Sequence, residues 1–308
     1  MILTAGLTPA WQQVMVFESF CFGEVNRASE VKWLAQGKVT NAGIGVHCLG
    51  GPSLTLATMG GPPLTQIDRE LDELGVPHRW VVTEVSTRVC TTILERSTGV
   101  ITELVENGRP LKASELDEFL RVYAEEAEKA DVAIITGSLP TGTPCTYYRE
   151  LVQRATCPVV LDFRGEGLLK TLDLKPLVVK PNREELTQTV GHPLENDEQL
   201  LAAMRSLNER GAQWAVVTRG DGPILATSAS KTYRFHPLSV ECVANPIGSG
   251  DAMTAGIAWA IRDGRSIVDS IKLGIAAATE NLRRIETCRL DPVWVVEHAE
   301  QVEVEEVG

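Results

Sequence analysis

The second half of the chain alternates short apolar segments with helical segments, and this alternation limits the fold more than any other feature. The apolar segments are three or four residues long: Val132–Ile135, Val159–Leu161, Leu177–Val179 and Ala215–Val217. Helical patterns precede or separate them, at residues 114–123, 147–152 and 200–207. Short strands that are apolar throughout are buried on both faces, because helices cover each side of such a sheet. The sequence therefore predicts an α/β fold, with a mainly parallel sheet and helices on both of its faces.

The first third of the chain differs, because β-forming residues dominate much of it. Residues 2–7 predict a first buried strand, while 14–22 and 80–106 are rich in β-branched and aromatic residues. The apolar face of 14–22 is suited to a lid or a subunit contact. Between these segments the pattern predicts three further elements: a helix at 43–49, a strand at 54–59 and a helix at 65–74 that Gly75 ends.

Three smaller features complete the predicted layout. Ser114 with Asp117 resembles a capping box, which would begin a helix at that point. Residues 224–235, with a polar Ser-Ala-Ser-Lys tip, predict a hairpin. The acidic tail at 302–308 predicts an exposed end of the chain.

A glycine turn runs directly into an alanine-rich segment at 245–256, where the sequence is N-P-I-G-S-G-D-A-M-T-A-G. Gly248 and Gly250 allow turn conformations and the close approach of a ligand. A helix that begins here would present free N–H groups and the positive end of its dipole, which together bind anions well. Asp251 could take a proton from a hydroxyl that attacks a phosphoryl group. Taken alone, the motif fits a glycine C-cap followed by an Asp N-cap equally well.

Three other polar sequences directly follow predicted strands: T-G-S-L-P after residue 135, K-P-N-R-E-E after 179 and T-R-G-D-G after 217. In an open α/β sheet, ligands bind beyond the carboxyl ends of the strands. We therefore expect these three loops and the G-x-G-D turn to meet in one crevice. Singly, K-P-N fits a strand end with Asn as a helix N-cap, and T-R-G-D-G fits an ordinary turn.

Composition and charge argue against several classes of partner. The 308-residue chain has a net charge of -12 and no run of Lys and Arg, so we expect no nucleic acid and no membrane as partner. Its seven cysteines are scattered and form no metal-binding spacing with the five histidines, which indicates reduced thiols in a cytoplasmic protein. We expect neither a signal peptide nor a membrane span, because no basic N-terminal region and no long apolar run occur.

Six segments occur in the order and spacing of one known family: G-E-V-N-R at 23–27, A-Q-G-K-V-T-N at 35–41, T-R-V at 87–89, G-S-L-P-T-G at 137–142, K-P-N-R-E-E-L at 180–186 and I-G-S-G-D at 247–251. The chain thus resembles the ribokinase-like carbohydrate kinases, the PfkB family, over nearly its whole length. The resemblance is greatest to the branch that holds 1-phosphofructokinase, 6-phosphofructokinase of this fold and tagatose-6-phosphate kinase.

This resemblance implies a single ribokinase-like catalytic domain over residues 1–308, with a small β lid that often also forms a homodimer contact. The lid strands would come from about 10–35 and 80–105. In the family the Asp of the G-x-G-D motif is the catalytic base, which makes Asp251 the base here. The anion hole for the γ-phosphoryl group in transfer would consist of the amides of Gly248, Ser249 and Gly250.

The resemblance also implies ATP and Mg²⁺ as cofactors, and it allows a monovalent cation. The positions that match the nucleotide site are Lys180, Thr218, Gly220 and Gly222, with Asn281 near the adenine. The family's N-x-x-E pattern matches Asn182 and Glu185, which would organise Mg²⁺ together with its water. This suits the ion, because Mg²⁺ takes few carboxylates and keeps several waters.

Departures from the family concentrate at the acceptor end. The family's N-P-A-L-D is T-P-A-W-Q at 8–12, so the carboxylate that holds sugar hydroxyls is an amide in this chain. The family's G-G-K-G-I-N is Q-G-K-V-T-N at 36–41, which lacks two of the glycines. We assign the acceptor contacts by position to Gln12, Gly37, Lys38, Asn41, Arg88 and Ser138.

The sequence is best interpreted as an ATP-dependent kinase that acts on a phosphorylated ketohexose such as fructose 1-phosphate or 6-phosphate. Lys38 and Arg88, with Arg27 as a third candidate, would hold the phosphate already on the sugar. The altered acceptor residues leave open a non-catalytic regulatory protein that binds sugar phosphate or nucleotide. Kinases of unphosphorylated sugars or of nucleosides share the fold and remain alternatives.

Overall fold

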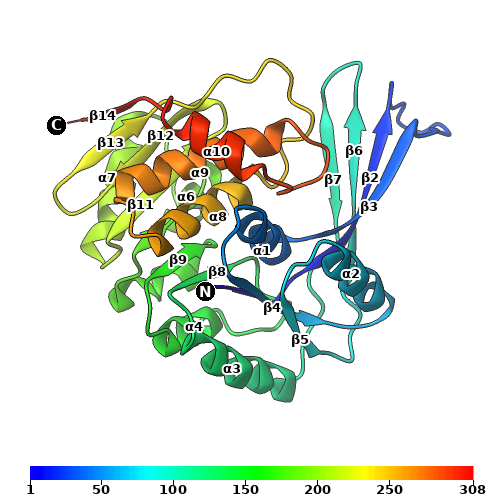
Figure 1. The fold of residues 1–308 in the computed structure, drawn as a ribbon, viewed down its shortest axis with the longest axis horizontal. Coiled ribbons are helices and arrows are strands. Elements are labelled where there is room, and N and C mark those ends of the chain that lie inside the picture. Colours follow the sequence, from blue (N-terminus) through cyan, green and yellow to red (C-terminus); the bar gives the residue numbers. More distant parts are fainter. Residues whose placement is uncertain (308) are drawn as a thin grey trace.

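A ten-stranded sheet forms the centre of the protein (Figure 1), whose computed structural model describes residues 1–307. The strand order is β14-β13-β12-β11-β10-β9-β8-β1-β4-β5. Every neighbouring pair from β11 to β5 is parallel, and the β12, β13 and β14 end is antiparallel. The strands are β1 (Ile2–Gly6), β4 (Ser53–Met59), β5 (His78–Val82), β8 (Val132–Thr136), β9 (Val159–Asp162), β10 (Val178–Val179), β11 (Trp214–Arg219), β12 (Gly222–Thr227), β13 (Thr232–Phe235) and β14 (Val304–Glu306).

Helices cover both faces of this sheet, which confirms the predicted α/β class. One face packs against α3 (Ala113–Ala127), α4 (Tyr147–Arg154), α5 (Glu166–Leu169), α6 (Arg183–Val190) and α7 (Asp197–Glu209). The other face packs against α1 (Lys38–Cys48), α2 (Pro62–Glu73), α8 (Ser249–Arg262), α9 (Ile267–Leu282) and α10 (Pro292–Ala299). The central strands are buried at every residue, because their apolar side chains meet a helix layer on each side.

A second sheet of four strands stands to one side of the body (Figure 1) and contains β2 (Ala10–Phe17), β3 (Glu30–Gln36), β6 (Arg88–Glu95) and β7 (Ile101–Val105). We call it the lid; its order is β3-β2-β6-β7. The sequence assigned all of residues 80–105 to this lid. The structure differs, because β5 at 78–82 pairs with β4 in the large sheet, and only β6 and β7 belong to the lid.

One local prediction is wrong, and another is incomplete. Helix α3 begins after Lys112, whose backbone N–H donates to the Glu115 carboxylate at 2.7 Å, so Ser114 and Asp117 form no capping box. The tail is largely exposed, as predicted, but residues 304–306 also form β14 and extend the sheet beside β13. The partner of β14 lies about 70 residues earlier in the chain, where no local pattern indicates it.

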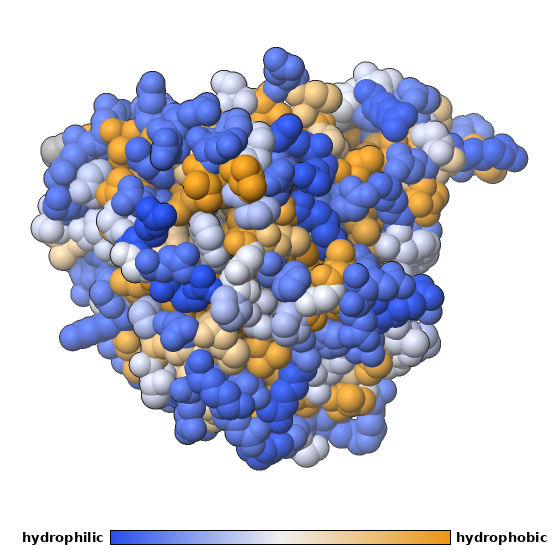
Figure 2. Space-filling model, viewed as in Figure 1, coloured by the Kyte–Doolittle hydropathy of each residue, from blue (hydrophilic) through white to orange (hydrophobic). Residues whose placement is uncertain are grey.

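The surface seen from the side of α1 and α9 is mixed in character. Figure 2 shows polar side chains over most of this face, with apolar ones in small groups between them. Within the described residues, no helix has the length and apolar character needed to cross a membrane.

Candidate active site

A cleft with a volume of about 1000 Å³ lies between the large sheet and the inner face of the lid. The loops after β10 and β11 line it, together with the turn that precedes α8. The prediction that four polar loops meet is thus correct for three of them. The fourth, the loop after β8, turns elsewhere, and its Pro140 lines a smaller cavity beside the cleft.

Asp251 is held in the first turn of α8, where its side chain is buried beside the cleft. The helix begins after Gly248, whose φ of 79° suits glycine. A Cβ at Gly248 would lie 1.9 Å from the Cγ2 of Thr287, so the turn also has no room for a side chain. Ser249 and Gly250 follow as the first residues of the helix, and all four residues line the cleft. The arrangement places a helix N-terminus and a buried carboxyl group at one point, as the sequence predicted.

The carboxyl group of Asp251 has surroundings that favour its protonated form. Its Oδ2 accepts a hydrogen bond of 2.8 Å from the Nδ2 of Asn41. Burial raises the pKa of Asp251 to about 7; the Asp162 carboxylate adds to the shift, whereas Lys38 and the Asn41 bond oppose it. A base with a pKa near neutrality can both accept and release a proton under ordinary conditions.

Asp162 at the end of β9 is a second buried carboxylate that our sequence interpretation left out of the site. Its Oδ1 lies 2.8 Å from the Nζ of Lys38, and its Oδ2 lies 3.3 Å from the Nζ of Lys180 and 2.9 Å from the hydroxyl of Thr254. Burial alone would raise the pKa of Asp162, but the two lysines outweigh it and bring the pKa to about 2. The sequence carried one indication that Asp162 belongs to the site, namely its position at the end of a buried parallel strand.

Lys38 lies at this carboxylate cluster, which the predicted phosphate clamp did not include, and it lines the same cleft as Arg88. Its Nζ contacts Asp162 and also lies 3.0 Å from the Oε1 of Glu185. Burial would lower the pKa of Lys38, but the charges of Asp162, Glu185 and Asp251 raise it above the ordinary value. Arg27, the third candidate for the clamp, is exposed on the β2–β3 connection. The sequence matched both positions to a family but could not show which carboxylates lay opposite Lys38.

Asn182 and Glu185 begin helix α6 with a reciprocal capping box. The Glu185 N–H donates to the Oδ1 of Asn182 at 2.8 Å, and the Asn182 N–H donates to the Oε2 of Glu185 at 3.0 Å. The N-cap interpretation of Asn182 is therefore correct, although both residues also line the cleft. Among residues 1–307 no group of three His, Cys, Asp or Glu side chains could hold a metal directly. The pair therefore fits a largely hydrated Mg²⁺ better than an ion that protein ligands enclose.

The nucleotide end of the cleft contains some of the predicted residues but not all. Lys180, Thr218 and Gly220 line it, and its wall includes the apolar side chains of Ile224, Leu238, Val240, Ile275 and Leu282. Gly222 lies outside the lining, where it pairs with Arg219 across the turn into β12.

Asn281 is buried and does not contact the cleft, in contrast to its predicted place near the adenine. Its Nδ2 donates to the carbonyl of Ile247 at 2.9 Å and to the hydroxyl of Ser249 at 3.1 Å. Its Oδ1 accepts from the N–H of Cys288 at 2.7 Å. Asn281 therefore positions the G-S-G-D turn from behind.

The acceptor end lies under the lid, where Gln12, Gly37 and Asn41 line the cleft. The Nε2 of Gln12 donates to the hydroxyl of Thr92 at 2.8 Å, which ties it to the neighbouring strand. Ser138 is exposed but does not line the cleft; its Oγ lies 3.2 Å from the hydroxyl of Thr8. Ser138 therefore stands apart from the other predicted acceptor residues.

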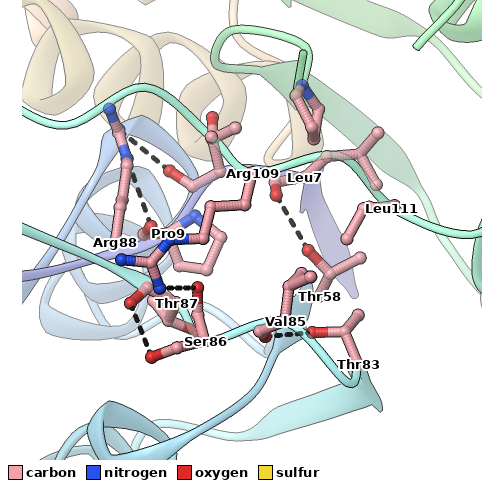
Figure 3. A pocket seen from close by; sticks show the side chains of 13 residues that line it. Leu7, Pro9, Thr58, Thr83, Val85, Ser86, Thr87, Arg88, Arg109 and Leu111 are labelled. Atoms are coloured by element: carbon pink, nitrogen blue, oxygen red, sulfur yellow. Dashed lines mark hydrogen bonds between the residues drawn. The ribbon is translucent and has the colours of Figure 1, made fainter. Parts of the chain in front are cut away.

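Arg88 lies between the cleft and the smaller cavity, and Figure 3 shows it from the latter beside Arg109. Its guanidinium donates to the carbonyls of Thr8 at 3.0 Å, Pro9 at 3.3 Å and Glu106 at 3.2 Å. These three bonds fix the planar group at the rim of the cleft. Two of its five N–H groups remain for a ligand.

Comparison with known proteins agrees with this geometry. Residues 6–293 match the family described as "pfkB family carbohydrate kinase". The chain belongs to the pfkB family of carbohydrate kinases. It is therefore an ATP-dependent sugar kinase.

Solved structures share this fold from end to end. A protein described as "Possible 1-phosphofructokinase" from Thermotoga maritima has a TM-score of 0.90 at 24% identity, with 100% of this chain and 99% of that chain covered. Three structures of phosphofructokinase-2 from Escherichia coli are a tetrameric inhibited form, a complex with fructose-6-phosphate and a complex with potassium. They have TM-scores of 0.84 to 0.86 at 20 to 21% identity, and cover 97% of this chain and 97 to 98% of theirs.

Proposed function

We propose that this sugar kinase transfers the γ-phosphoryl group of ATP to a hydroxyl of a phosphorylated ketohexose, with Asp251 as the general base. The observation that supports this most directly is the buried carboxyl group of Asp251 at the N-terminus of α8, next to the lysine-bound Asp162. The acceptor would lie under the lid, and ATP would lie along the apolar wall toward α9.

In the proposed reaction the acceptor hydroxyl oxygen forms a bond to the γ-phosphorus. Asp251 takes the hydroxyl proton, and the bond from the γ-phosphorus to the bridging oxygen of ADP breaks. The N–H groups of the turn at 248–250 face the charge that develops on the transferred phosphoryl group. Lys180 and Lys38 add positive charge beside this point, although Asp162 partly offsets it.

We propose that Asn182 and Glu185 would hold Mg²⁺ chiefly through water, with Asp162 as a second carboxylate nearby. Both carboxylates already accept bonds from lysines, so each has only part of its acceptor capacity left for metal-bound water. When bound with ATP, the ion would neutralise phosphate charge. A monovalent cation is a further proposal, supported by the potassium complex of phosphofructokinase-2.

Arg88 supports a phosphorylated acceptor, because its planar group lies at the cleft rim with N–H groups to spare. The fructose-6-phosphate complex of phosphofructokinase-2 is in keeping with this choice. An unphosphorylated sugar is a second candidate, and the position of Lys38 favours it. With Lys38 on the carboxylate cluster, the described lid offers the cleft a single cation, Arg88.

We also propose that the protein forms a homodimer through the outer face of the lid and works in the cytoplasm. Val31 and Trp33 on β3 are 45% and 44% exposed, and Leu104 on β7 is 56% exposed. Their strand partners Met15 and Thr91 place them on one face, opposite the cleft. An apolar sheet face of this kind is typical of a subunit contact.

The test is a coupled assay of ADP release with fructose, ribose, fructose 1-phosphate, fructose 6-phosphate and tagatose 6-phosphate as acceptors. Asp251→Asn, prepared in parallel, measures any contaminating kinase. We expect the wild type to act best on one of the sugar phosphates. Faster turnover of fructose or ribose than of the sugar phosphates would show that the acceptor is an unphosphorylated sugar. No turnover of any acceptor would contradict the proposed substrate class.

A further inference from the structure

The lid contains a carboxylate in the cleft, Glu103, to which the sequence motifs assigned no role. Glu103 lies on β7 and lines the same cleft as Gln12 and Arg88. Gln12 is an amide, so it offers a sugar hydroxyl neither the charge nor the full acceptor capacity of a carboxylate. A carboxylate elsewhere on the inner face of the lid would supply what Gln12 lacks.

Strand register places Glu103 on the same inner face as Gln12, with β6 between them. Gln12 lies opposite Cys90 in the pair β2 and β6, and Thr92 lies two residues further along the same face. Thr92 is directly opposite Glu103 in the pair β6 and β7. The Nε2 of Gln12 already reaches the Thr92 hydroxyl at 2.8 Å. Because directly opposed residues have Cβ atoms about 5 Å apart, the row from Gln12 through Thr92 to Glu103 is continuous.

The Glu103 carboxylate has no hydrogen-bonding or ion-pairing partner among residues 1–307, unlike Glu106 on the same strand end. Burial raises the pKa of Glu103, and the charge of Arg88 opposes this shift. The Glu103 side chain is exposed on the cleft surface, so its carboxylate is open to a ligand that provides hydrogen-bond donors.

We propose that Glu103 binds hydroxyl groups of the sugar acceptor and takes over the role of a carboxylate at position 12. In this arrangement Gln12 on β2 and Glu103 on β7 face the hydroxyls from either side of β6, while Arg88 holds the far end of the acceptor. The carboxylate thus moves two strands across the lid, from β2 to β7, without leaving the inner face. This proposal rests on the proposed function, since it concerns the acceptor of that reaction.

The first test is Glu103→Gln, assayed with the sugar or sugar phosphate on which the wild type is most active. Loss of a charged hydrogen-bond acceptor should raise the KM for that acceptor about tenfold to a hundredfold. The KM for ATP should stay unchanged, because Glu103 lies at the lid end of the cleft. Glu18→Gln is the matched control, since Glu18 is a lid carboxylate that is 75% exposed and pairs with Arg96. The control should keep the wild-type KM for the acceptor.

The second test returns a carboxylate to position 12. In the variant that already contains Glu103→Gln, the added change Gln12→Glu should recover a large part of the acceptor affinity, because the new carboxylate faces the same hydroxyls. A merely structural role of Glu103 would give no such rescue. Calorimetric titration of the same acceptor into each variant measures affinity independently of turnover.

The outcomes separate this proposal from the proposed function. An active wild type whose acceptor KM and affinity do not change in Glu103→Gln would overturn the role of Glu103 alone. A rise in KM without rescue by Gln12→Glu would also overturn it, in favour of a structural role. A wild type that neither binds nor phosphorylates any of the five acceptors would overturn the proposed function, and this inference with it.

Discussion

Asp251 and Asp162 are both buried, yet their surroundings shift their pKa values in opposite directions. Asp162 has two lysines within 3.3 Å, which keep it ionised. Within residues 1–307, the neutral amide of Asn41 is the one side chain that donates a hydrogen bond to Asp251, so burial dominates its pKa. The pair thus divides two tasks, because one carboxylate anchors the positive charge of the site while the other can exchange a proton.

Replacement of the base tests this division directly. Asp251→Asn should lower kcat by about 10² to 10⁴ and leave the affinity for ATP nearly unchanged, since the lost group acts on the acceptor proton. In the wild type, activity should fall as the pH drops below about 7, because the base becomes protonated. Steady-state kinetics across pH and nucleotide titration provide both measurements. A variant with the wild-type kcat would remove Asp251 from the mechanism.

The same shifts predict how stability depends on pH. The raised pKa of Asp251 means that its stabilising effect is complete below its ordinary pKa of 3.8 and is lost as the pH rises through about 7. Asp251→Asn should therefore raise the free energy of unfolding relative to the wild type mainly at alkaline pH. For Asp162 the lowered pKa reverses the sign, and its contribution is lost only as the pH falls from 3.8 toward about 2.

Asp162→Asn should accordingly cost about 3–5 kcal/mol at neutral pH, because it leaves Lys180 buried without its partner. Urea unfolding of both variants and the wild type at several pH values checks the two signs. Parallel pH dependence in all three proteins would contradict the assigned shifts.

Arg88 and Arg109 provide a test residue and its matched control for binding of the acceptor phosphate. Both line the smaller cavity in Figure 3, but only Arg88 also lines the cleft. Arg88→Ala should raise the KM for a sugar phosphate more than tenfold, through loss of about 1.5–3 kcal/mol, and should not change the KM for ATP. Arg109→Ala should change neither constant. Equal sugar constants in the wild type and Arg88→Ala would favour the unphosphorylated acceptor.

At the scale of elements, the start of α8 combines tight packing with function. Gly248 has a positive φ and no space for a Cβ, whereas a Cβ at Gly250 would meet only the Nζ of Lys180, at an ordinary van der Waals distance of 3.5 Å. Glycine is therefore required at these two positions of the motif for different structural reasons. The first makes the turn, and the second leaves the helix N-terminus open to a phosphate.

The variants Gly248→Ala and Gly250→Ala should separate these reasons. Gly248→Ala should destabilise the protein by about 1–3 kcal/mol, because Thr287 must move and the backbone is strained. Gly250→Ala should have a urea unfolding midpoint equal to or above that of the wild type, since alanine favours a helix. The same variant should weaken ATP binding. Equal stability of the two variants would show that the turn relaxes more easily than its packing indicates.

At the scale of the whole molecule, the two faces of the lid have different environments. Its inner face roofs the cleft, and its outer face exposes Trp33, which stacks on Trp11 with ring centroids 5.8 Å apart. Trp33→Lys should break the proposed homodimer, because a charge would replace the centre of the apolar contact. Val293→Lys on α10 is the control, as Val293 is 64% exposed and distant from the lid in the chain.

Sedimentation velocity at several protein concentrations measures the assembly state of each variant. We expect the wild type and Val293→Lys to sediment as dimers, and Trp33→Lys as a monomer with reduced acceptor affinity. A wild-type monomer, or a dimer that persists in Trp33→Lys, would place the subunit contact elsewhere or remove it.

The sequence by itself determined the class of fold and the family of kinases. Short apolar strands alternating with helices allow little besides a parallel sheet covered on both faces, because each such strand needs a helix layer on either side. The G-S-G-D motif likewise predicted a helix start at this turn, since its glycines and its aspartate lie within one turn. These predictions succeeded because the physical cause lies within a few residues of the signal.

Only the tertiary structure decided which distant side chains meet. Lys38 and Asp162 are 124 residues apart in the sequence, and Gln36 and Thr287 are 251 apart, yet both pairs are in hydrogen-bond contact. No local pattern could show that Lys38 contacts Asp162 and Glu185, that Asn281 packs behind the turn or that β5 belongs to the large sheet. The reason is that burial and charge pairing depend on the whole packed chain, whereas helix starts and strand alternation depend on neighbours in sequence.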